Sequence, residues 1–305
     1  MNFRSLIVAV VVLGALGGVL YWSQHRKPAE EVAPVTTVTA ILKVNAADVT
    51  QLTIKQKTPV SVAKTDGKWQ ITQPASYPAD GEAVAGVLST LSGLNADRVV
   101  EDKASDRKQY GLDPPVVEID ITGKGHATQQ LLLGDETPAG GNVYAALAGD
   151  PRIFTIASFS KTSLAKNLND LRDKSLLTLS PDRVSRVEVL KKPEAIEFDR
   201  TKDGWQILKP KASPADALTV NDLVRTLTGA KMDLSAASNT SADFALATPV
   251  ATAKLTGDTG VQTLEVRKNK NDYYAKSSVV PGAYKVDSAL GQALDKKAED
   301  FQSKK

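Results

Sequence analysis

The chain has 305 residues, of which 42% are hydrophobic and 24% charged, a composition typical of folded domains and sufficient for two modest cores. Its 38 basic and 35 acidic side chains leave a formal net charge of only +3, which argues against the basic face that nucleic-acid binding requires. Because the chain contains no cysteine, disulfides, thiolate nucleophiles and cysteine-ligated zinc are excluded, and an oxidising compartment poses no risk of mispairing.

The first element predicted in chain order is a membrane anchor. Residues 5–22 (SLIVAVVVLGALGGVLYW) form an uncharged apolar run. As a helix this run would extend about 27 Å, close to the thickness of the hydrocarbon core of a bilayer. Tyr21 and Trp22 at its end are typical of the lipid interface. A cleaved signal peptide is the alternative, but the residues that follow offer no small-residue cleavage site. We therefore expect residues 1–27 to hold the chain in a membrane.

The anchor and the segment after it carry two further signals. Positive residues flank the apolar run on both sides, so charge alone does not fix its orientation. Gly14 and Gly18 form a Gly-x-x-x-Gly pattern, which allows two helices to approach closely and is consistent with a weak dimer. Residues 28–40 contain two prolines and predict an extended linker to the soluble part.

The rest of the chain is a tandem duplication, visible when Trp69 is aligned with Trp205 at an offset of 205 − 69 = 136 residues. Other motifs match at the same offset or close to it: Pro-Ala-Asp at 78–80 and 214–216, Tyr110 and Phe244, Tyr144 and Tyr274. Loop lengths drift while the pattern persists. We predict a first repeat over residues 41–176 and a second over residues 177–305.

Each copy has the same predicted order of elements: a small meander, a helix, a second group of strands and a closing helix. Apolar residues at helical spacing predict the first helix of each copy, after Asp80 and after Asp216. Alternating runs predict the later strands, at 116–122, 128–133, 142–147 and 152–156 in the first copy and 250–256, 261–266, 272–276 and 283–286 in the second. The closing helices are predicted over 160–172 and 288–301. The fold class is therefore α+β, two antiparallel-sheet domains with covering helices.

The two copies differ most in one predicted hairpin loop. Asp135 and Glu136 make this loop acidic in the first copy, whereas Arg267 and Lys268 make its counterpart basic. Since loops diverge freely while a core is retained, we predict that these four residues contribute to binding a protein partner. Two solvated turns without a role are the alternative.

No catalytic group stands out in the sequence. His25 lies at the membrane edge and His126 in a predicted turn, and neither has carboxylates at ligand spacing. Two serine–lysine pairs have the spacing of a lysine-activated nucleophile but lack companion motifs: Ser158 with Lys161, and Ser163 with Lys166. Trp69 and Trp205 stand at equivalent places and are interpreted as core anchors. The charged stretch 101–108 is interpreted as a solvated loop. We expect neither an enzyme nor a cofactor or metal site.

Several motifs of the first copy resemble those of a known family. They are Asp-Arg-Val-Val-Glu-Asp at 97–102, Tyr-Gly-Leu-Asp-Pro-Pro at 110–115, Leu-Gly-Asp at 133–135, Val-Tyr-Ala at 143–145 and Leu-Arg-Asp-Lys-Ser-Leu at 171–176. With them the chain resembles the bacterial domain-of-unknown-function 4340 (DUF4340) family, strongly over residues 48–180 and more weakly over the second copy. The resemblance implies one membrane helix followed by an extracytoplasmic domain, in some members beside a gliding-motility-type ABC transporter, and supplies no catalytic residues.

From these features we expect a single-pass protein of the bacterial inner membrane with a periplasmic soluble part. Its expected role is that of a non-enzymatic interaction module or auxiliary subunit of an envelope or ABC-transporter complex, with no nucleic-acid partner. The alternative is a binding protein or hydrolase for envelope polymers. That alternative needs a cleft between the copies with convergent polar groups, such as two carboxylates about 5 to 10 Å apart.

Overall fold

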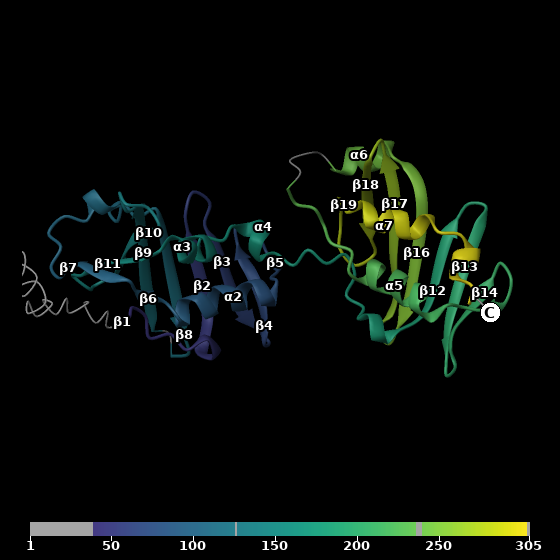
Figure 1. Cartoon of the computed structure of the whole chain (residues 1–305), viewed down its shortest axis with the longest axis horizontal. Helices are drawn as coiled ribbons and strands as arrows, with labels where there is room; N and C mark the ends of the chain where they lie inside the picture. Colours follow the sequence, from purple (N-terminus) through teal and green to yellow (C-terminus); the bar gives the residue numbers. More distant parts are fainter. Residues whose placement is uncertain (1–38, 126, 236–239, 304–305) are drawn as a thin grey trace, which may run out of the picture.

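The computed structural model describes residues 39–125, 127–235 and 240–303. Within these residues two antiparallel sheets, of nine and eight strands, follow one another along the long axis of the molecule (Figure 1). The predicted anchor at residues 5–22, with Gly14 and Gly18, lies outside the described residues. In the described part of the chain no helix is long and apolar enough to cross a bilayer.

We call the unit built on the first sheet repeat 1. The strand order is β5-β4-β3-β2-β8-β9-β10-β11-β7. The strands are β2 (Val49–Lys55), β3 (Val60–Thr65), β4 (Lys68–Gln73), β5 (Tyr77–Pro78), β7 (Arg98–Glu101), β8 (Val117–Gly123), β9 (Thr128–Glu136), β10 (Asn142–Leu147) and β11 (Ile153–Ala157). The helices are α2 (Gly81–Ser92), α3 (Ser158–Leu164) and α4 (Leu168–Leu171), with short 3-10 turns η1 (Ala46–Asp48) and η2 (Lys108–Tyr110).

Repeat 2 has the equivalent order, β15-β14-β13-β12-β16-β17-β18-β19. Its strands are β12 (Val184–Lys191), β13 (Glu194–Thr201), β14 (Gly204–Lys209), β15 (Ser213–Pro214), β16 (Thr248–Gly257), β17 (Gly260–Asn269), β18 (Asp272–Ser277) and β19 (Ala283–Val286). Its helices are α5 (Ala217–Thr228), α6 (Thr240–Leu246) and α7 (Ser288–Asp295), with 3-10 turns η3 (Pro181–Arg183) and η4 (Ala298–Phe301). The prediction of an α+β fold with two antiparallel sheets and helices is confirmed.

The Pro-Ala-Asp motif starts the first helix of each repeat. Asp80 accepts hydrogen bonds from the backbone N–H groups of Glu82 and Ala83 at 3.0 and 3.1 Å, and Asp216 accepts one from that of Thr219 at 3.0 Å. An aspartate in this position satisfies N–H groups that the first turn of a helix leaves without partners. The motif therefore explains why both helices begin where they do.

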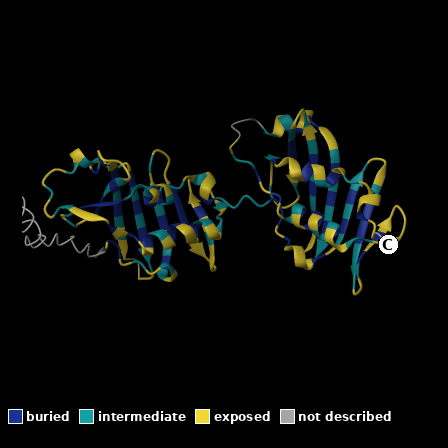
Figure 2. Ribbon diagram, in the orientation of Figure 1, coloured by how far each residue is buried: buried dark blue, intermediate teal, exposed yellow. Residues whose placement is uncertain are grey.

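The apolar stripes predicted for these helices form the two cores. In each helix four residues of the stripe are buried: Val84, Val87, Leu88 and Leu91 in α2, and Val220, Leu223, Val224 and Leu227 in α5. They pack against the inward side chains of the sheet, and Figure 2 shows these buried positions alternating with more exposed ones along the central strands. Burying such a stripe against a sheet is what stabilises a helix of this length.

Both closing helices differ from the prediction of one continuous helix. Residues 165–167 separate α3 from α4, because the Asn167 side chain accepts from the N–H groups of Asn169 and Asp170 while Asp170 accepts from the N–H of Asn167. This capping box starts a new helix and so ends the preceding one. In repeat 2, α7 ends at Asp295, and Lys296 and the extended Lys297 separate it from η4.

The connection between the repeats is bonded to both of them. Asp173 donates its N–H to the carbonyl of Pro78 in repeat 1 at 2.9 Å, and Lys174 accepts from the N–H of Met232 in repeat 2 at 2.8 Å. The guanidinium of Arg172 lies 4.1 Å from the ring centre of Tyr77 and donates to the hydroxyl of Tyr284 at 3.3 Å. We call Arg172, Tyr77 and Tyr284 the junction latch. Asp173 and Lys174 are adjacent in the chain, and the first bonds to repeat 1 while the second bonds to repeat 2. The two repeats therefore follow one another directly, with hydrogen-bonded residues at their connection.

Candidate functional site

The four residues predicted to form the divergent loops lie in strands. Asp135 and Glu136 end β9, and Glu136 pairs with Val143 of β10. Arg267 and Lys268 lie inside β17, paired with Tyr274 and Tyr273 of β18. The prediction of loop positions is wrong because both ladders continue beyond the last core side chain, and polar residues on a partly exposed strand have the hydropathy of a loop. The acidic and the basic pair lie in different sheets and do not form one site.

Asp135 belongs to a compact group of residues on the face of the first sheet opposite α2. Here the segment Tyr110–Leu112 packs directly on β9. A Cβ on Gly134 would overlap the carbonyl oxygen of Tyr110, and one on Gly111, whose φ is +63°, would overlap the carboxylate of Asp135. Only glycine allows this approach of backbone to strand. Two sequence motifs, Tyr-Gly-Leu and Leu-Gly-Asp, therefore form one packed unit.

A tyrosine fixes this unit to the edge of the sheet. The hydroxyl of Tyr110 donates to Glu101 Oε1 at 2.5 Å, and its ring packs edge-to-face on Tyr144 with centroids 4.8 Å apart. The hydrogen bond to Glu101, together with burial, raises the pKa of Tyr110 to about 12. We call Glu101, Tyr110, Gly134, Asp135 and Tyr144 the motif cluster. The interpretation of Glu101 as part of a solvated loop is wrong: it lies at the end of β7 and accepts the hydrogen bond that holds Tyr110 in the cluster.

In repeat 2 the strand and the segment at the equivalent place contact each other through different side chains. The registers pair Leu133 with Ala145 and Val266 with Ala275, so Arg267 takes the place of Gly134. Its guanidinium lies 4.6 Å from the ring centre of Phe244, the counterpart of Tyr110, and pairs with Glu265 at 2.7 Å. Phe244 packs in turn against Tyr274 and Ala283. The two clusters are equivalent in position and opposite in surface charge.

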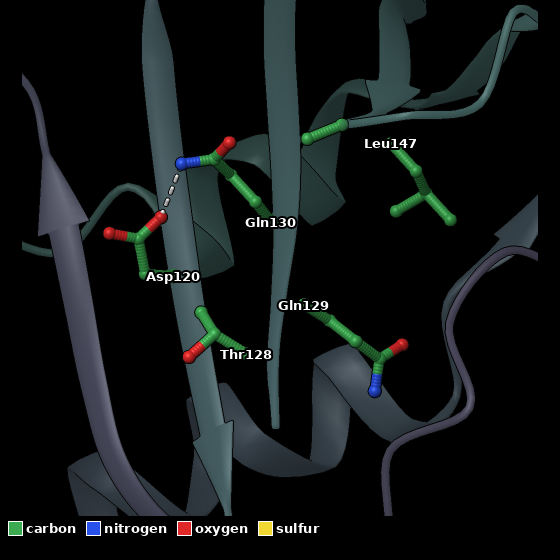
Figure 3. A pocket seen from close by; sticks show the side chains of 6 residues that line it. Asp120, Thr128, Gln129, Gln130 and Leu147 are labelled. Atoms are coloured by element: carbon green, nitrogen blue, oxygen red, sulfur yellow. Dashed lines mark hydrogen bonds between the residues drawn. The ribbon is translucent and has the colours of Figure 1, made fainter. Parts of the chain in front are cut away.

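One hollow lies on the open face of the first sheet. It encloses about 350 Å³ and is lined by Asp120, Thr128, Gln129, Gln130, Leu147 and Ala148. Figure 3 shows Asp120 and Gln130 turned toward one another, and their hydrogen bond measures 2.8 Å. Lys55 pairs with Asp120 at 2.7 Å and with Glu118 at 2.6 Å, and these two hydrogen bonds raise its pKa. The polar groups here satisfy one another, which describes a solvated strand face.

Two further hollows lie at equivalent places in the two repeats, one beside the start of α3 and the other beside the start of α7. The hollow of repeat 1 encloses about 610 Å³ and is lined by the end of α2, by β6 (Asn95–Ala96) and by Phe159. That of repeat 2 encloses about 450 Å³. It is charged, with Lys285 bonded to Asp272 at 2.8 Å and Asp233 close by. The two equivalent hollows therefore differ in character: that of repeat 1 is more apolar, and that of repeat 2 contains an ion pair.

The remaining candidates have structural partners. Lys161 donates to the carbonyl of Gly134 at 2.8 Å and so holds α3 to β9. Trp205 is buried, and its indole N–H donates to Asn221 at 2.9 Å, while the half-buried Trp69 packs against the first core. The interpretation of both tryptophans as packing residues is confirmed. His25 and His126 lie outside the described residues.

The comparisons with known proteins agree with the duplication. A family profile described as "Domain of unknown function (DUF4340)" matches residues 69–212 and, a second time, residues 205–305. The chain belongs to the DUF4340 family. The two DUF4340 matches begin at Trp69 and Trp205, the pair that aligns the copies in the sequence. Neither the comparison with curated proteins nor that with solved structures gives a match.

Proposed function

We propose that this DUF4340 protein is a membrane-anchored interaction module, held by residues 1–27 in the bacterial inner membrane with its repeats in the periplasm. Its partners are other proteins of an envelope or ABC-transporter complex, for which it is a non-enzymatic auxiliary subunit. The apolar run at 5–22 supports the anchor, and the resemblance of the motifs to envelope proteins supports the outward orientation.

The observation that carries the proposal is that the two repeats share one backbone fold but expose different side chains at equivalent places. Both repeats have the same capped helix and the same order of eight strands, to which repeat 1 adds β7, yet Gly134 and Asp135 are replaced by Arg267 and Lys268. A duplicated enzyme would need its reacting groups in a defined constellation, whereas a docking protein needs only distinct surfaces on a stable frame. The junction latch places these surfaces on one connected body.

A hydrolase or polymer-binding protein would need convergent polar groups in a cleft between the repeats. Three of the hollows in the described residues each lie within a single repeat, and a fourth, of about 470 Å³ where the connection meets repeat 2, is lined by only one carboxylate, Asp173. The interaction module is therefore the function that the geometry supports best.

Crosslinking in native membranes tests this function. A photoreactive residue placed at Glu136, exposed at the end of β9, should capture a protein of a membrane complex. The same residue placed at Glu194, which starts β13 of repeat 2, is the matched control. We expect a distinct partner at position 136, and its crosslink should be lost when Asp135 is replaced by lysine. Identical background capture at both positions would refute the proposed docking surface.

The Gly-x-x-x-Gly pattern extends the proposal to a weak dimer through the anchor. Replacing Gly14 with isoleucine should reduce self-association measured in membranes, because the larger side chain keeps the two helices apart. Unchanged self-association would remove the dimer from the account and leave the interaction module intact.

A further inference from the structure

The described chain begins at one corner of repeat 1. Strand β1 (Thr39–Ala40) pairs with β6, and Ile41 donates its N–H to the carbonyl of Leu94 at 3.1 Å. Figure 1 places β1, β6 and β7 at the end of the molecule away from repeat 2. Any tether formed by the preceding residues is therefore attached at this end.

The same corner holds the larger of the two equivalent hollows, which we call the tether-side hollow. Leu94, Asn95 and Ala96, the residues bonded to the incoming chain, contribute to its lining. Phe159 stands on its rim with 72% of its surface exposed, and Val99 of the nearby edge strand β7 is 43% exposed. The lining is mixed: Leu94, Ala96 and Ala157 lie beside polar residues that include Asp97, whose carboxylate accepts from the Asn142 side chain at 2.8 Å. Large apolar side chains exposed beside such a hollow indicate a contact surface.

Repeat 2 lacks this feature at the equivalent place. Ser158 and Ser288 start the two equivalent helices, so the counterpart of Phe159 is Ala289. The hollow there carries the Asp272–Lys285 ion pair instead. The aromatic rim therefore belongs only to the repeat on which the tether is attached.

The length of the tether allows the bilayer to contact this surface. Between Trp22, the last residue of the predicted anchor, and Thr39 the chain can reach roughly 60 Å when fully extended. The bilayer is thus within reach of the tether-side hollow, whereas repeat 2 lies at the opposite end of the long axis from β1 and β6 (Figure 1). Aromatic side chains with apolar neighbours are favoured at the boundary between lipid headgroups and acyl chains.

We propose that the tether-side hollow of repeat 1 rests on the bilayer, with the ring of Phe159 inserted at the boundary between headgroups and acyl chains. This inference rests on the proposed function, because it requires the anchor at residues 5–22. It fixes the orientation of the molecule: repeat 1 lies on the lipid, and repeat 2 with its ionic hollow projects into the periplasm.

The absence of cysteine allows a direct test with the full chain. Three variants, Phe159→Cys, Leu218→Cys and Leu246→Cys, each receive one environment-sensitive fluorophore, and each is reconstituted in phosphatidylethanolamine–phosphatidylglycerol vesicles that contain brominated acyl chains. The native side chains are similarly exposed, at 72%, 80% and 80%. The label at 159 should be quenched several-fold more than the labels at 218 and 246. Equal quenching at all three positions would overturn the proposal.

A second label keeps the phenylalanine in place. A fluorophore at Ser89, which lines the same hollow, should be quenched in the native background and lose most of that quenching when Phe159 is replaced by serine. A label at 159 that is shielded from aqueous iodide but not quenched by lipid would show that the hollow is covered by protein, in these vesicles by this chain itself, and would also overturn the proposal.

Flotation of the same vesicles distinguishes a failure of the proposed membrane anchor from a failure of the proposed contact between the hollow and the bilayer. A chain that does not float with the vesicles refutes the anchor and, with it, this inference. A chain that floats while its label at 159 stays unquenched refutes only the placement on the bilayer.

Discussion

The two repeats reach the same backbone arrangement through different contacts. In repeat 1 Gly134 lets the backbone of Tyr110 lie directly on strand β9. In repeat 2 the equivalent strand carries Arg267, which stacks on Phe244. A duplicated frame thus tolerates an exchange of close backbone packing for a cation–π contact, and the exchange reverses the charge of the surface.

The outgoing ends of the repeats show the same contrast. Leu171 accepts from the N–H of Asp80, and Phe301 accepts from that of Asp216, both at 2.8 Å. The residue after Leu171 is Arg172 of the junction latch, whereas Gln302 follows Phe301. The backbone pairing is common to both repeats, and the latch is found where repeat 1 meets repeat 2. Four changes test how far this equivalence extends.

The largest effect is expected in the cores, where the repeats should behave alike. Leu91→Ala in α2 and Leu227→Ala in α5 each remove a fully buried side chain at equivalent positions. Each should destabilise its own repeat by about 3 kcal/mol, through lost burial and the cavity left behind. Urea denaturation of single-tryptophan variants that keep either Trp69 or Trp205 measures the two repeats separately. A loss confined to one variant would show that the cores are not equivalent.

The next change tests the motif cluster, where the repeats should differ. Gly134→Ala places a methyl group against the carbonyl oxygen of Tyr110. Because backbone must move, we expect repeat 1 to lose about 2 kcal/mol. Gly86→Ala is the matched control in α2, where an added Cβ meets no atom within 4 Å, and it should be neutral or stabilising by up to about 1 kcal/mol. Equal behaviour of the two variants in denaturation would contradict the close packing.

A smaller effect is expected from Tyr110→Phe, which gives repeat 1 the ring that repeat 2 has in Phe244. Loss of the hydrogen bond to Glu101 should cost about 1 to 2 kcal/mol. Since the pKa of Tyr110 is raised to about 12 in the folded state, this stabilisation is fully present below pH 10 and is lost as the pH rises through 12. An absorbance titration of the phenolate should show a step near pH 12 that the variant lacks. Because the variant lacks one phenol, the position of the missing step is what decides: a missing step near pH 10, the ordinary pKa of tyrosine, would remove Tyr110 from the cluster.

The smallest effect on stability is expected at the junction latch. Arg172→Ala removes the contacts to Tyr77 and Tyr284 and should cost about 1 kcal/mol or less, because the contacts are only partly buried. Its main result should be a wider range of distances between the repeats. Arg200→Ala, which removes a cation–π contact to Trp205 inside repeat 2, is the control and should leave those distances unchanged. Identical distances in both variants would exclude the latch.

Much of the frame follows from local sequence signals. The Pro-Ala-Asp caps, the apolar stripes of α2 and α5 and the alternating strands predict the elements, because each depends on residues close in sequence. The division of the closing helix was also readable, since Asn167 and Asp170 have the spacing of a capping box. The ends of the hairpin strands cannot be predicted in this way, because a polar residue at the end of a strand has the same hydropathy as a loop residue.

The surface clusters and the junction depend on contacts between distant segments. Nothing near Arg172 in the sequence indicates Tyr284, which lies 112 residues away. Glu101 and Tyr110 lie nine residues apart, but their bond needs the edge strand β7 and the following segment to fold back over the sheet. Such pairings depend on the tertiary fold, and one sequence does not specify them.

The most direct test of the account is a distance measurement between the repeats. Spin labels at Glu82 and Leu218, exposed positions in the first turns of α2 and α5 and separated by the repeat offset of 136, report on both copies at once (218 − 82 = 136). Pulsed electron-spin resonance on the cysteine-free full chain should give one narrow distance distribution that broadens in Arg172→Ala. A broad distribution in the native chain would contradict a single body that presents two different surfaces.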